Sequence, residues 1–212
     1  EKLNCISFLG GGSLPTDIVL LKLLCRKFSA CKYFEIGTWR GESIINVSEV
    51  SEECYTLNLS KSEMKNLGLN EKYIEMNGYF IKNNTKIKQL EGDSMTFDFG
   101  ELNQQFDVIF IDGNHHYEYI KNDTEKVFRH LVHDQSIVVW HDYMYTPEKL
   151  RPQVMAAILD GTPEKFRQHL YYVSNTMCAI FIRESLPTSK FDLPLIPTNI
   201  FELDITSKKY KH

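Results

Sequence analysis

The sequence lacks a hydrophobic run long enough to cross a bilayer. Its longest apolar stretch, residues 18–24, is interrupted by Lys22 and falls far short of the roughly 20 residues that a spanning helix needs. A basic stripe is also absent: 24 Lys and Arg against 28 Asp and Glu give a formal net charge of −4, with the charges scattered. Because proteins that bind duplex nucleic acid concentrate positive charge, we expect neither a nucleic-acid nor a membrane partner.

Closely spaced cysteine pairs are missing as well. The five cysteines are odd in number and widely spaced, without a C-x-x-C pair. This pattern predicts reduced core thiols and a cytoplasmic protein, and it disfavours a disulfide scaffold. The glycine run at residues 10–12 is not followed by Lys-Ser or Lys-Thr, which excludes a phosphate-binding P-loop there.

What the sequence does contain is a regular alternation of short β-rich runs and helical patterns, which predicts a parallel sheet flanked by helices. Residues 107–111 form an unbroken apolar run, typical of a strand buried on both faces. Strands are expected at 33–36, 54–59, 87–90, 107–111 and 136–140, followed by an antiparallel hairpin of 170–173 and 178–182. Helices are expected at 14–28, 42–50, 120–131 and 152–159, with a further helix and an excursion within 61–86.

The chain is 212 residues long and has no internal repeat, so we expect a single domain over residues 1–212. Residues 1–13 are expected to be a flexible entry segment that folds over a pocket. Residues 186–212 contain several prolines and are expected to form an extended tail along the surface.

Four motifs follow four of the predicted strands. They are Glu35-x-Gly37-x-x-x-Gly41, Gly92-Asp93-Ser94, Asp112-Gly113-Asn114-His115-His116-Tyr117-Glu118 and His141-Asp142-Tyr143. Ligands of open α/β sheets bind beyond the carboxyl ends of the strands, so all four motifs fall where a ligand site is expected.

In this order, the motifs resemble those of the class I S-adenosylmethionine-dependent methyltransferases, in particular the subgroup with a D-G-x-H-x-Y-E motif (methyltransferase domain 24). The resemblance covers residues 14–183. It implies an α/β fold: a Rossmann-like three-layer sandwich whose mostly parallel, seven-stranded sheet ends in a C-terminal antiparallel hairpin. It also implies S-adenosylmethionine as the cofactor.

The resemblance assigns roles in binding the cofactor. It places Glu35 near the amino-acid end, where a carboxylate suits an ammonium group; the alternative is a strand-end acid that caps the next helix. Asn58 stands where the family carries an acid for the ribose, and an amide lacks the charge-assisted strength of a carboxylate. Asp93 and Ser94 fall beside the adenine, or alternatively cap a turn. The expected cofactor contacts are Glu35, Gly37, Thr38, Trp39, Gly41, Ser43, Asn58, Asp93, Ser94 and Asp112.

The loop of residues 37–41, called the glycine loop below, is part of the predicted cofactor site. Gly37 and Gly41 bracket a turn where the backbone is expected to pass close to a ligand, and its spacing is not the G-x-G-x-x-G of nicotinamide-binding folds. Trp39 lies inside the loop, and we expect it to pack on the cofactor or on the N-terminal helix.

Ionisable residues cluster at the ends of strands 107–111 and 136–140. If these strands are neighbours, about 4.8 Å apart, Asp112 and Asp142 point into one space, where two carboxylates repel unless a cation or proton intervenes. We predict a divalent cation held by Asp112, His141 and Asp142: Mg²⁺ for oxygen ligands, or Mn²⁺, Fe²⁺ or Zn²⁺ if histidine dominates. Without a metal, His115 or His141 is the expected base. The alternative for each histidine is a structural role.

The predicted catalytic residues are therefore Asp112, His115 and His141, and the predicted reaction is O-methylation of a small-molecule or sugar-like hydroxyl, assisted by a divalent cation. Two alternatives stay open: a metal-dependent oxygenase or hydrolase on the same fold, and a catalytically silent module that binds a nucleoside. The sequence specifies neither the acceptor nor the oligomeric state, and a homo-oligomer remains compatible with it.

Overall fold

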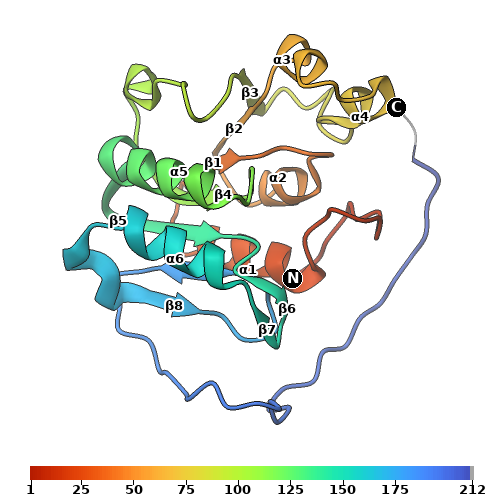
Figure 1. Ribbon diagram of the computed structural model, residues 1–212. Coiled ribbons are helices and arrows are strands. Elements are labelled where there is room, and N and C mark those ends of the chain that lie inside the picture. The colour runs from red at the N-terminus through yellow and green to blue at the C-terminus, as the bar shows by residue number, and fades with distance from the viewer. Residues whose placement is uncertain (211–212) are drawn as a thin grey trace.

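A seven-stranded sheet lies at the centre of the computed structural model, which describes residues 1–210 (Figure 1). Its strand order is β3-β2-β1-β4-β5-β9-β8. Neighbours among β1 to β5 pair in parallel, whereas β9 runs antiparallel to both β5 and β8. The strands are β1 (Lys32–Ile36), β2 (Glu53–Asn58), β3 (Ile87–Glu91), β4 (Phe106–Ile111), β5 (Val132–Trp140), β8 (Leu170–Tyr172) and β9 (Ala179–Phe181). The predicted mostly parallel sheet with its closing hairpin is confirmed.

Helices cover both faces of the sheet and make it the middle of three layers. One face packs against α1 and α2 through side chains such as Leu21 and Ile44, and the other against α5 and α6 through Val127 and Ile158. The helices are α1 (Pro15–Cys25), α2 (Glu42–Val47), α3 (Lys61–Asn66), α4 (Glu71–Met76), α5 (Tyr117–His130) and α6 (Pro152–Gly161), with short 3₁₀ helices at Phe99–Leu102 and Glu164–His169. The Rossmann-like sandwich is thereby confirmed.

Two parts of the chain hold elements that the sequence pattern does not resolve. Residues 61–86 contain two short helices where one was predicted, and Ser60 and Asn70 each cap one of them by accepting a backbone N–H. After β5, the chain forms a small hairpin of β6 (Met144–Thr146) and β7 (Lys149–Leu150). Strands of two or three residues are too short to show an alternating pattern.

The N-terminal segment 1–13 lies along α2. The backbone N–H of Ser7 donates to the Glu42 carboxylate, and the carbonyl of Gly10 accepts a hydrogen bond from the Arg40 guanidinium. The segment that we expected to be flexible is therefore tied to the start of α2 by hydrogen bonds.

Residues 186–210 of the C-terminal segment form no helix or strand. The segment passes around the outside of the molecule and reaches the region of α4, where the Tyr210 ring packs on that of Phe80 (Figure 1). Residues 211–212 of the predicted tail lie outside the described residues. Between residues 1 and 210, no helix has the length and apolar character needed to cross a membrane.

The register of the central strands brings the predicted motifs to one edge of the sheet. Ile36 of β1 pairs with Ile111 of β4, and Ile111 pairs with Trp140 of β5. Because adjacent parallel strands lie about 4.8 Å apart, the residues that follow these three strands emerge side by side. The prediction that β4 and β5 are neighbours is confirmed.

Candidate active site

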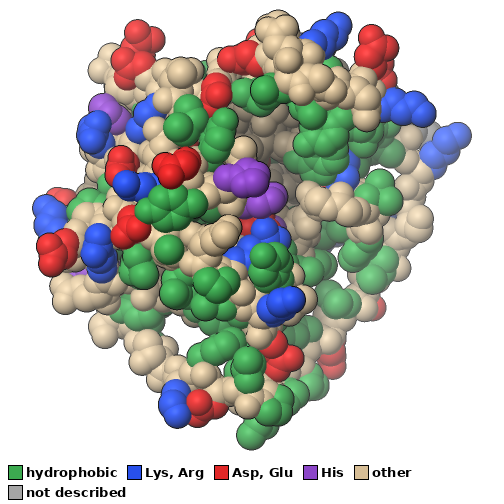
Figure 2. Space-filling view, viewed as in Figure 1, with side chains coloured by type: hydrophobic (Ala, Val, Ile, Leu, Met, Phe, Trp, Pro, Cys, Tyr) green, Lys and Arg blue, Asp and Glu red, His purple; other side chains and the backbone are tan. Residues whose placement is uncertain are grey.

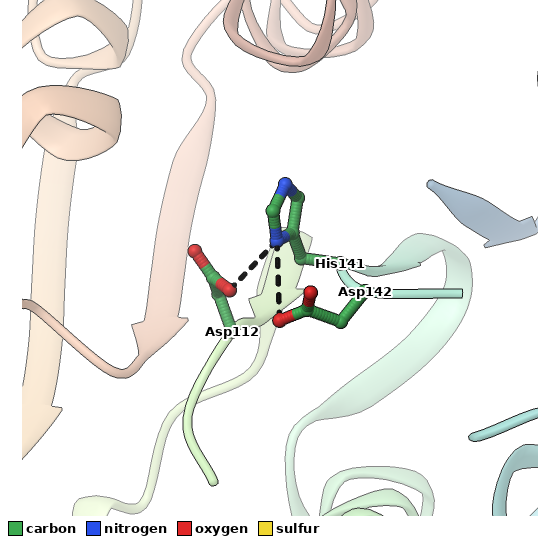
Figure 3. A group of neighbouring side chains, drawn as sticks. All are labelled: Asp112, His141 and Asp142. Atoms are coloured by element: carbon green, nitrogen blue, oxygen red, sulfur yellow. Dashed lines mark ion pairs between the residues drawn. The ribbon is translucent and has the colours of Figure 1, made fainter. Parts of the chain in front are cut away.

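Three ligand atoms converge where β4 and β5 end (Figure 3). Asp112 directly follows β4, and His141 and Asp142 directly follow β5. Nδ1 of His141 is 3.0 Å from Oδ1 of Asp112 and 3.5 Å from Oδ2 of Asp142. The three atoms lie within 4.8 Å of one another. The fold thus brings together the three residues that the sequence predicts as metal ligands.

Asp142 reaches the cluster through an unusual backbone conformation. Its φ of +58° is left-handed, a region that Asp tolerates better than most residues. Its Oδ1 pairs with the Arg151 guanidinium at 2.8 Å, whereas its Oδ2 faces His141. One carboxylate oxygen is therefore fixed by an ion pair, and the other is left to the cluster.

Each ionisable group in the cluster has a shifted pKa. Desolvation raises the pKa of Asp112. Burial by itself lowers the pKa of His141, but the carboxylates around the ring outweigh burial and hold the pKa well above its usual value. For Asp142, burial raises the pKa, yet His141 and Arg151 outweigh it, and the net pKa is lowered. The cluster therefore favours a positive charge at its centre, whether a proton or a cation.

The donor set fits a divalent cation. Nδ1 of His141 is buried and has no hydrogen-bond partner among residues 1–210, although carboxylate oxygens lie close to it. A metal ligand is a role that such a nitrogen can fill. Carboxylate oxygens suit Mg²⁺ and Mn²⁺, and an imidazole nitrogen shifts the preference toward Mn²⁺, Fe²⁺ or Zn²⁺.

Asp17, which the sequence analysis does not single out, contacts the cluster from behind. It lies in the first turn of α1, is fully buried, and places Oδ2 3.1 Å from Nε2 of His141. Acids are common in the first turn of helices, so no local signal marks this one as functional. The contact joins residues 124 positions apart and depends on how α1 packs against the sheet.

Glu35 is the buried acid of the other half of the site. It is the fourth residue of the five-residue strand β1, is completely buried, and accepts a hydrogen bond of 2.7 Å from the Tyr33 hydroxyl. Burial raises its pKa to about 8, although the nearby Ser43 and Tyr33 hydroxyls act in the opposite direction. Its Oε1 has no hydrogen-bond partner within the described part of the chain. An unpartnered buried carboxylate oxygen is suited to receive a cationic group such as an ammonium.

The glycine loop lies between Glu35 and the cluster of Asp112, His141 and Asp142. Gly37 has a φ of +95°, and a Cβ there would lie 2.1 Å from the carbonyl oxygen of Asp112. Gly41 caps the N-terminus of α2 at a φ of +83°, where a Cβ would lie 2.8 Å from the Ile81 side chain. What approaches Gly37 closely in this structure is therefore the backbone after β4, a contact that the sequence analysis did not foresee.

The other predicted loop residues, Thr38 and Trp39, face different neighbours. The Thr38 hydroxyl is buried and shares a hydrogen bond with that of Thr56. The Trp39 ring packs on Tyr73 of α4 with centroids 4.4 Å apart, and a Cβ on Gly11 would lie 3.4 Å from its Nε1. The tryptophan thus contacts α4 and the entry segment.

The residues predicted to contact ribose and adenine have protein partners of their own. The side-chain amide of Asn58 donates to the Asn77 side chain at 2.9 Å. Oδ1 of Asp93 accepts the backbone N–H of Met95 at 2.9 Å, which is the turn-capping role considered above. The backbone carbonyl of Ser94 accepts hydrogen bonds from α5. All three residues are thus held by hydrogen bonds within the protein.

His115 and His116 stack at the entrance of the site, in the loop between β4 and α5. The His115 side chain is 56% exposed, and its Nδ1 lies 3.6 Å from Oδ2 of Asp142. Histidine side chains gather near the middle of the face drawn in Figure 2. A small cavity of about 10 Å³, room for about one water molecule, lies among His115, the cluster and the start of α5. It is smaller than most ligand sites, so a nucleoside-sized ligand requires the surrounding loops to open.

Comparison with known proteins agrees with this architecture. Residues 34–143, about half of the chain, match the family model described as a methyltransferase domain. No protein of curated function matches the sequence. The O-methyltransferase from Bacillus cereus in complex with S-adenosylhomocysteine (SAH) superimposes with a TM-score of 0.56 at 17% identity, covering 82% of this chain and 84% of that one.

Two further structures have the same fold. The SAH-bound methyltransferase PaMTH1 of Podospora anserina gives a TM-score of 0.54 at 16% identity, with 82% of this chain and 81% of that chain covered. The TDP-rhamnose 3'-O-methyltransferase CalS11 of calicheamicin biosynthesis gives 0.51 at 16% identity, with 80% of each chain covered. The family match includes the ends of β1, β2, β3, β4 and β5, and all the predicted site residues lie within the matched range. The chain therefore belongs to the methyltransferase domain 24 family of class I S-adenosylmethionine-dependent methyltransferases.

Proposed function

We propose that this protein transfers the methyl group of S-adenosylmethionine to a hydroxyl oxygen with the help of a divalent cation. The observation that carries the proposal is the convergence of Asp112, His141 and Asp142 on one point, where the buried Nδ1 of His141 lies 3.0 Å from Oδ1 of Asp112 and 3.5 Å from Oδ2 of Asp142. Gly37 connects this point to the loop after β1, because its Cα packs against the backbone of Asp112. Cofactor and cation sites would thus share one wall.

The cofactor would bind along the ends of β1, β2 and β3. Glu35 would receive its ammonium group, since one carboxylate oxygen is buried without a partner in the described structure. Asn58 would face the ribose, where its amide can hydrogen-bond a diol without a full charge. Ser94 and Asp93 would border the adenine. The remaining expected contacts are Gly37, Thr38, Trp39, Gly41, Ser43 and Asp112.

The cation would be held by Asp112, His141 and Asp142. When bound, it would lower the pKa of an acceptor hydroxyl and orient the oxygen toward the methyl group. His115 would serve as the general base, because it is exposed at the entrance and lies within reach of Asp142. His141 is nearly fully buried behind the carboxylates, so we assign it to cation binding and not to proton transfer with the acceptor.

The acceptor would be the hydroxyl of a small molecule or a sugar-like hydroxyl. Support comes from solved structures with a similar fold, which include an O-methyltransferase and a TDP-rhamnose 3'-O-methyltransferase. The four buried cysteines are free thiols, which fits the predicted reducing, cytoplasmic location. The cytoplasmic location and the formation of a homo-oligomer are predictions from the sequence.

Calorimetric titration with SAH, followed by turnover of S-adenosylmethionine against a panel of phenols, catechols and sugars, tests this function. We expect SAH binding and an activity that a chelator removes and divalent ions restore. Activity that survives chelation would reject the cation, and SAH binding without any turnover would favour the silent nucleoside-binding module. Tight binding of redox-active Fe²⁺, with O₂ consumed and no methyl transfer, would favour an oxygenase.

A further inference from the structure

The buried acid Asp17 makes contacts that a helix cap does not require. Its Oδ2 accepts a hydrogen bond of 2.7 Å from the backbone N–H of Leu14, which is the expected cap of α1. Its Oδ1 accepts a hydrogen bond of 2.8 Å from the backbone N–H of Met177, a residue in the turn between β8 and β9. In addition, Oδ2 lies 3.1 Å from Nε2 of His141. One fully buried carboxylate thus joins α1, the hairpin and the cluster.

His141 is held from two opposite sides. On one side Nε2 faces Asp17, and on the other Nδ1 faces the carboxylates of Asp112 and Asp142. The backbone N–H of His141 donates to the carbonyl of Ile111, which fixes the base of the side chain. A neutral imidazole carries its proton on one nitrogen only, so a carboxylate that accepts from Nε2–H leaves a lone pair on Nδ1.

Histidines that bind metals commonly donate their other ring N–H to a carboxylate, which fixes the tautomer and the ring orientation. We propose that Asp17 is a positioning residue: it holds His141 with Nε2–H directed at α1 and Nδ1 directed at the cation. This inference rests on the proposed function, since it assigns Asp17 a role toward the cation that Asp112, His141 and Asp142 would bind.

Asp17→Asn is the test variant because it changes the preferred tautomer with little change of shape. With its carbonyl oxygen still accepting from Met177, the new amide would present N–H to Nε2 of His141, and the proton would move to Nδ1. The amide nitrogen cannot accept the N–H of Leu14, so the variant also loses this cap of α1, and its unfolding free energy is measured beside its Mn²⁺ affinity. We expect Mn²⁺ to bind 10- to 100-fold more weakly, in line with the loss of other such partners. SAH affinity should stay within about threefold. Asp123→Asn, an equally buried acid in α5, is the matched control and should leave Mn²⁺ affinity unchanged.

The ¹⁵N chemical shifts of the His141 ring nitrogens report its tautomer. A purely structural role of Asp17 would not determine these shifts. In ¹⁵N-histidine-labelled wild type loaded with Zn²⁺ as a diamagnetic probe, we expect a protonated Nε2 and a metal-bound Nδ1. This measurement needs no variant, so it decides the matter even if Asp17→Asn fails to fold. A protonated Nδ1, or a metal on Nε2, would overturn the proposal.

Two results separate this inference from the proposed function. If wild type binds Mn²⁺ and a folded Asp17→Asn variant binds it equally well, the role of Asp17 is wrong and the cation site stands. If wild type binds neither Mn²⁺ nor Zn²⁺ in the presence of SAH, the cation site fails, and the role of Asp17 fails with it.

Discussion

The two halves of the sheet edge satisfy their polar groups in different ways. On the half formed by β1, β2 and β3, Asn58 bonds to Asn77 at the end of α4, and Asp93 bonds within its own turn. Glu35 keeps one oxygen without a hydrogen-bond partner among the described residues. On the half formed by β4 and β5, by contrast, Asp112 and Asp142 crowd one imidazole nitrogen.

The difference shows what each half needs from a ligand. The first half is already ordered, so the cofactor adds hydrogen bonds to a largely formed surface, with Glu35 as its one strong electrostatic contact. The second half concentrates negative charge that a proton or cation must balance. Substitution of one polar residue on the first half should therefore change only the ligand contact of that residue. On the second half, substitution of one residue should change the binding contributions of its neighbours as well.

The largest effect is expected where the two halves touch. Gly37→Val would place a Cβ 2.1 Å from the Asp112 carbonyl oxygen at a left-handed φ of +95°, so the loop must shift. Overpacking and backbone strain together should cost roughly 2–6 kcal/mol of the free energy of unfolding and weaken both SAH and Mn²⁺ binding. Denaturant titration measures the cost. The matched control is Gly10→Ala, because nothing lies within 4 Å of a Cβ there.

A smaller effect is expected on SAH affinity, through its dependence on pH. Burial raises the pKa of Glu35 to about 8. Because an ammonium group binds the ionised carboxylate, SAH affinity should increase by roughly tenfold per pH unit between pH 6 and 8. Calorimetry in buffers of different ionisation enthalpy should show release of one proton. Glu35→Gln should weaken binding and remove this pH dependence; a variant that keeps it would show that another group is responsible.

The stability of the ligand-free protein should change with pH in the opposite direction. The folded-state pKa of Glu35 lies above its model value of 4.5, so the folded state holds a proton that the unfolded state has lost. Stability should therefore fall as pH rises from about 4.5 to 8. Glu35→Gln should flatten this part of the profile in thermal unfolding.

The smallest change in SAH affinity is expected from substitutions of Asn58. Asn58→Asp would restore a carboxylate toward the ribose, and a charge-assisted bond should strengthen SAH binding by about 1 kcal/mol. The Asn77 amide can turn to donate to the new acid. Asn58→Ala should weaken binding by a similar amount. Unchanged affinity in both variants would place the ribose elsewhere.

Much of the fold followed from sequence because the signals are local. The apolar run of β4 and the motifs at strand ends predict a parallel sheet, and pairing of β4 with β5 then brings Asp112 and Asp142 together. The contact of Asp17 with His141 could not be predicted in this way, since it depends on the packing of α1 against the sheet. Likewise, the close approach of Gly37 to Asp112 depends on how two loops from different strands fold against each other.

The central claim is that one cation binds at the junction of Asp112, His141 and Asp142 beside the cofactor. Electron paramagnetic resonance during a Mn²⁺ titration of the SAH-saturated protein measures this most directly. We expect one tightly bound Mn²⁺ per chain, lost in Asp112→Ala while SAH still binds. Binding that is absent in wild type, or that persists unchanged in Asp112→Ala, would contradict it.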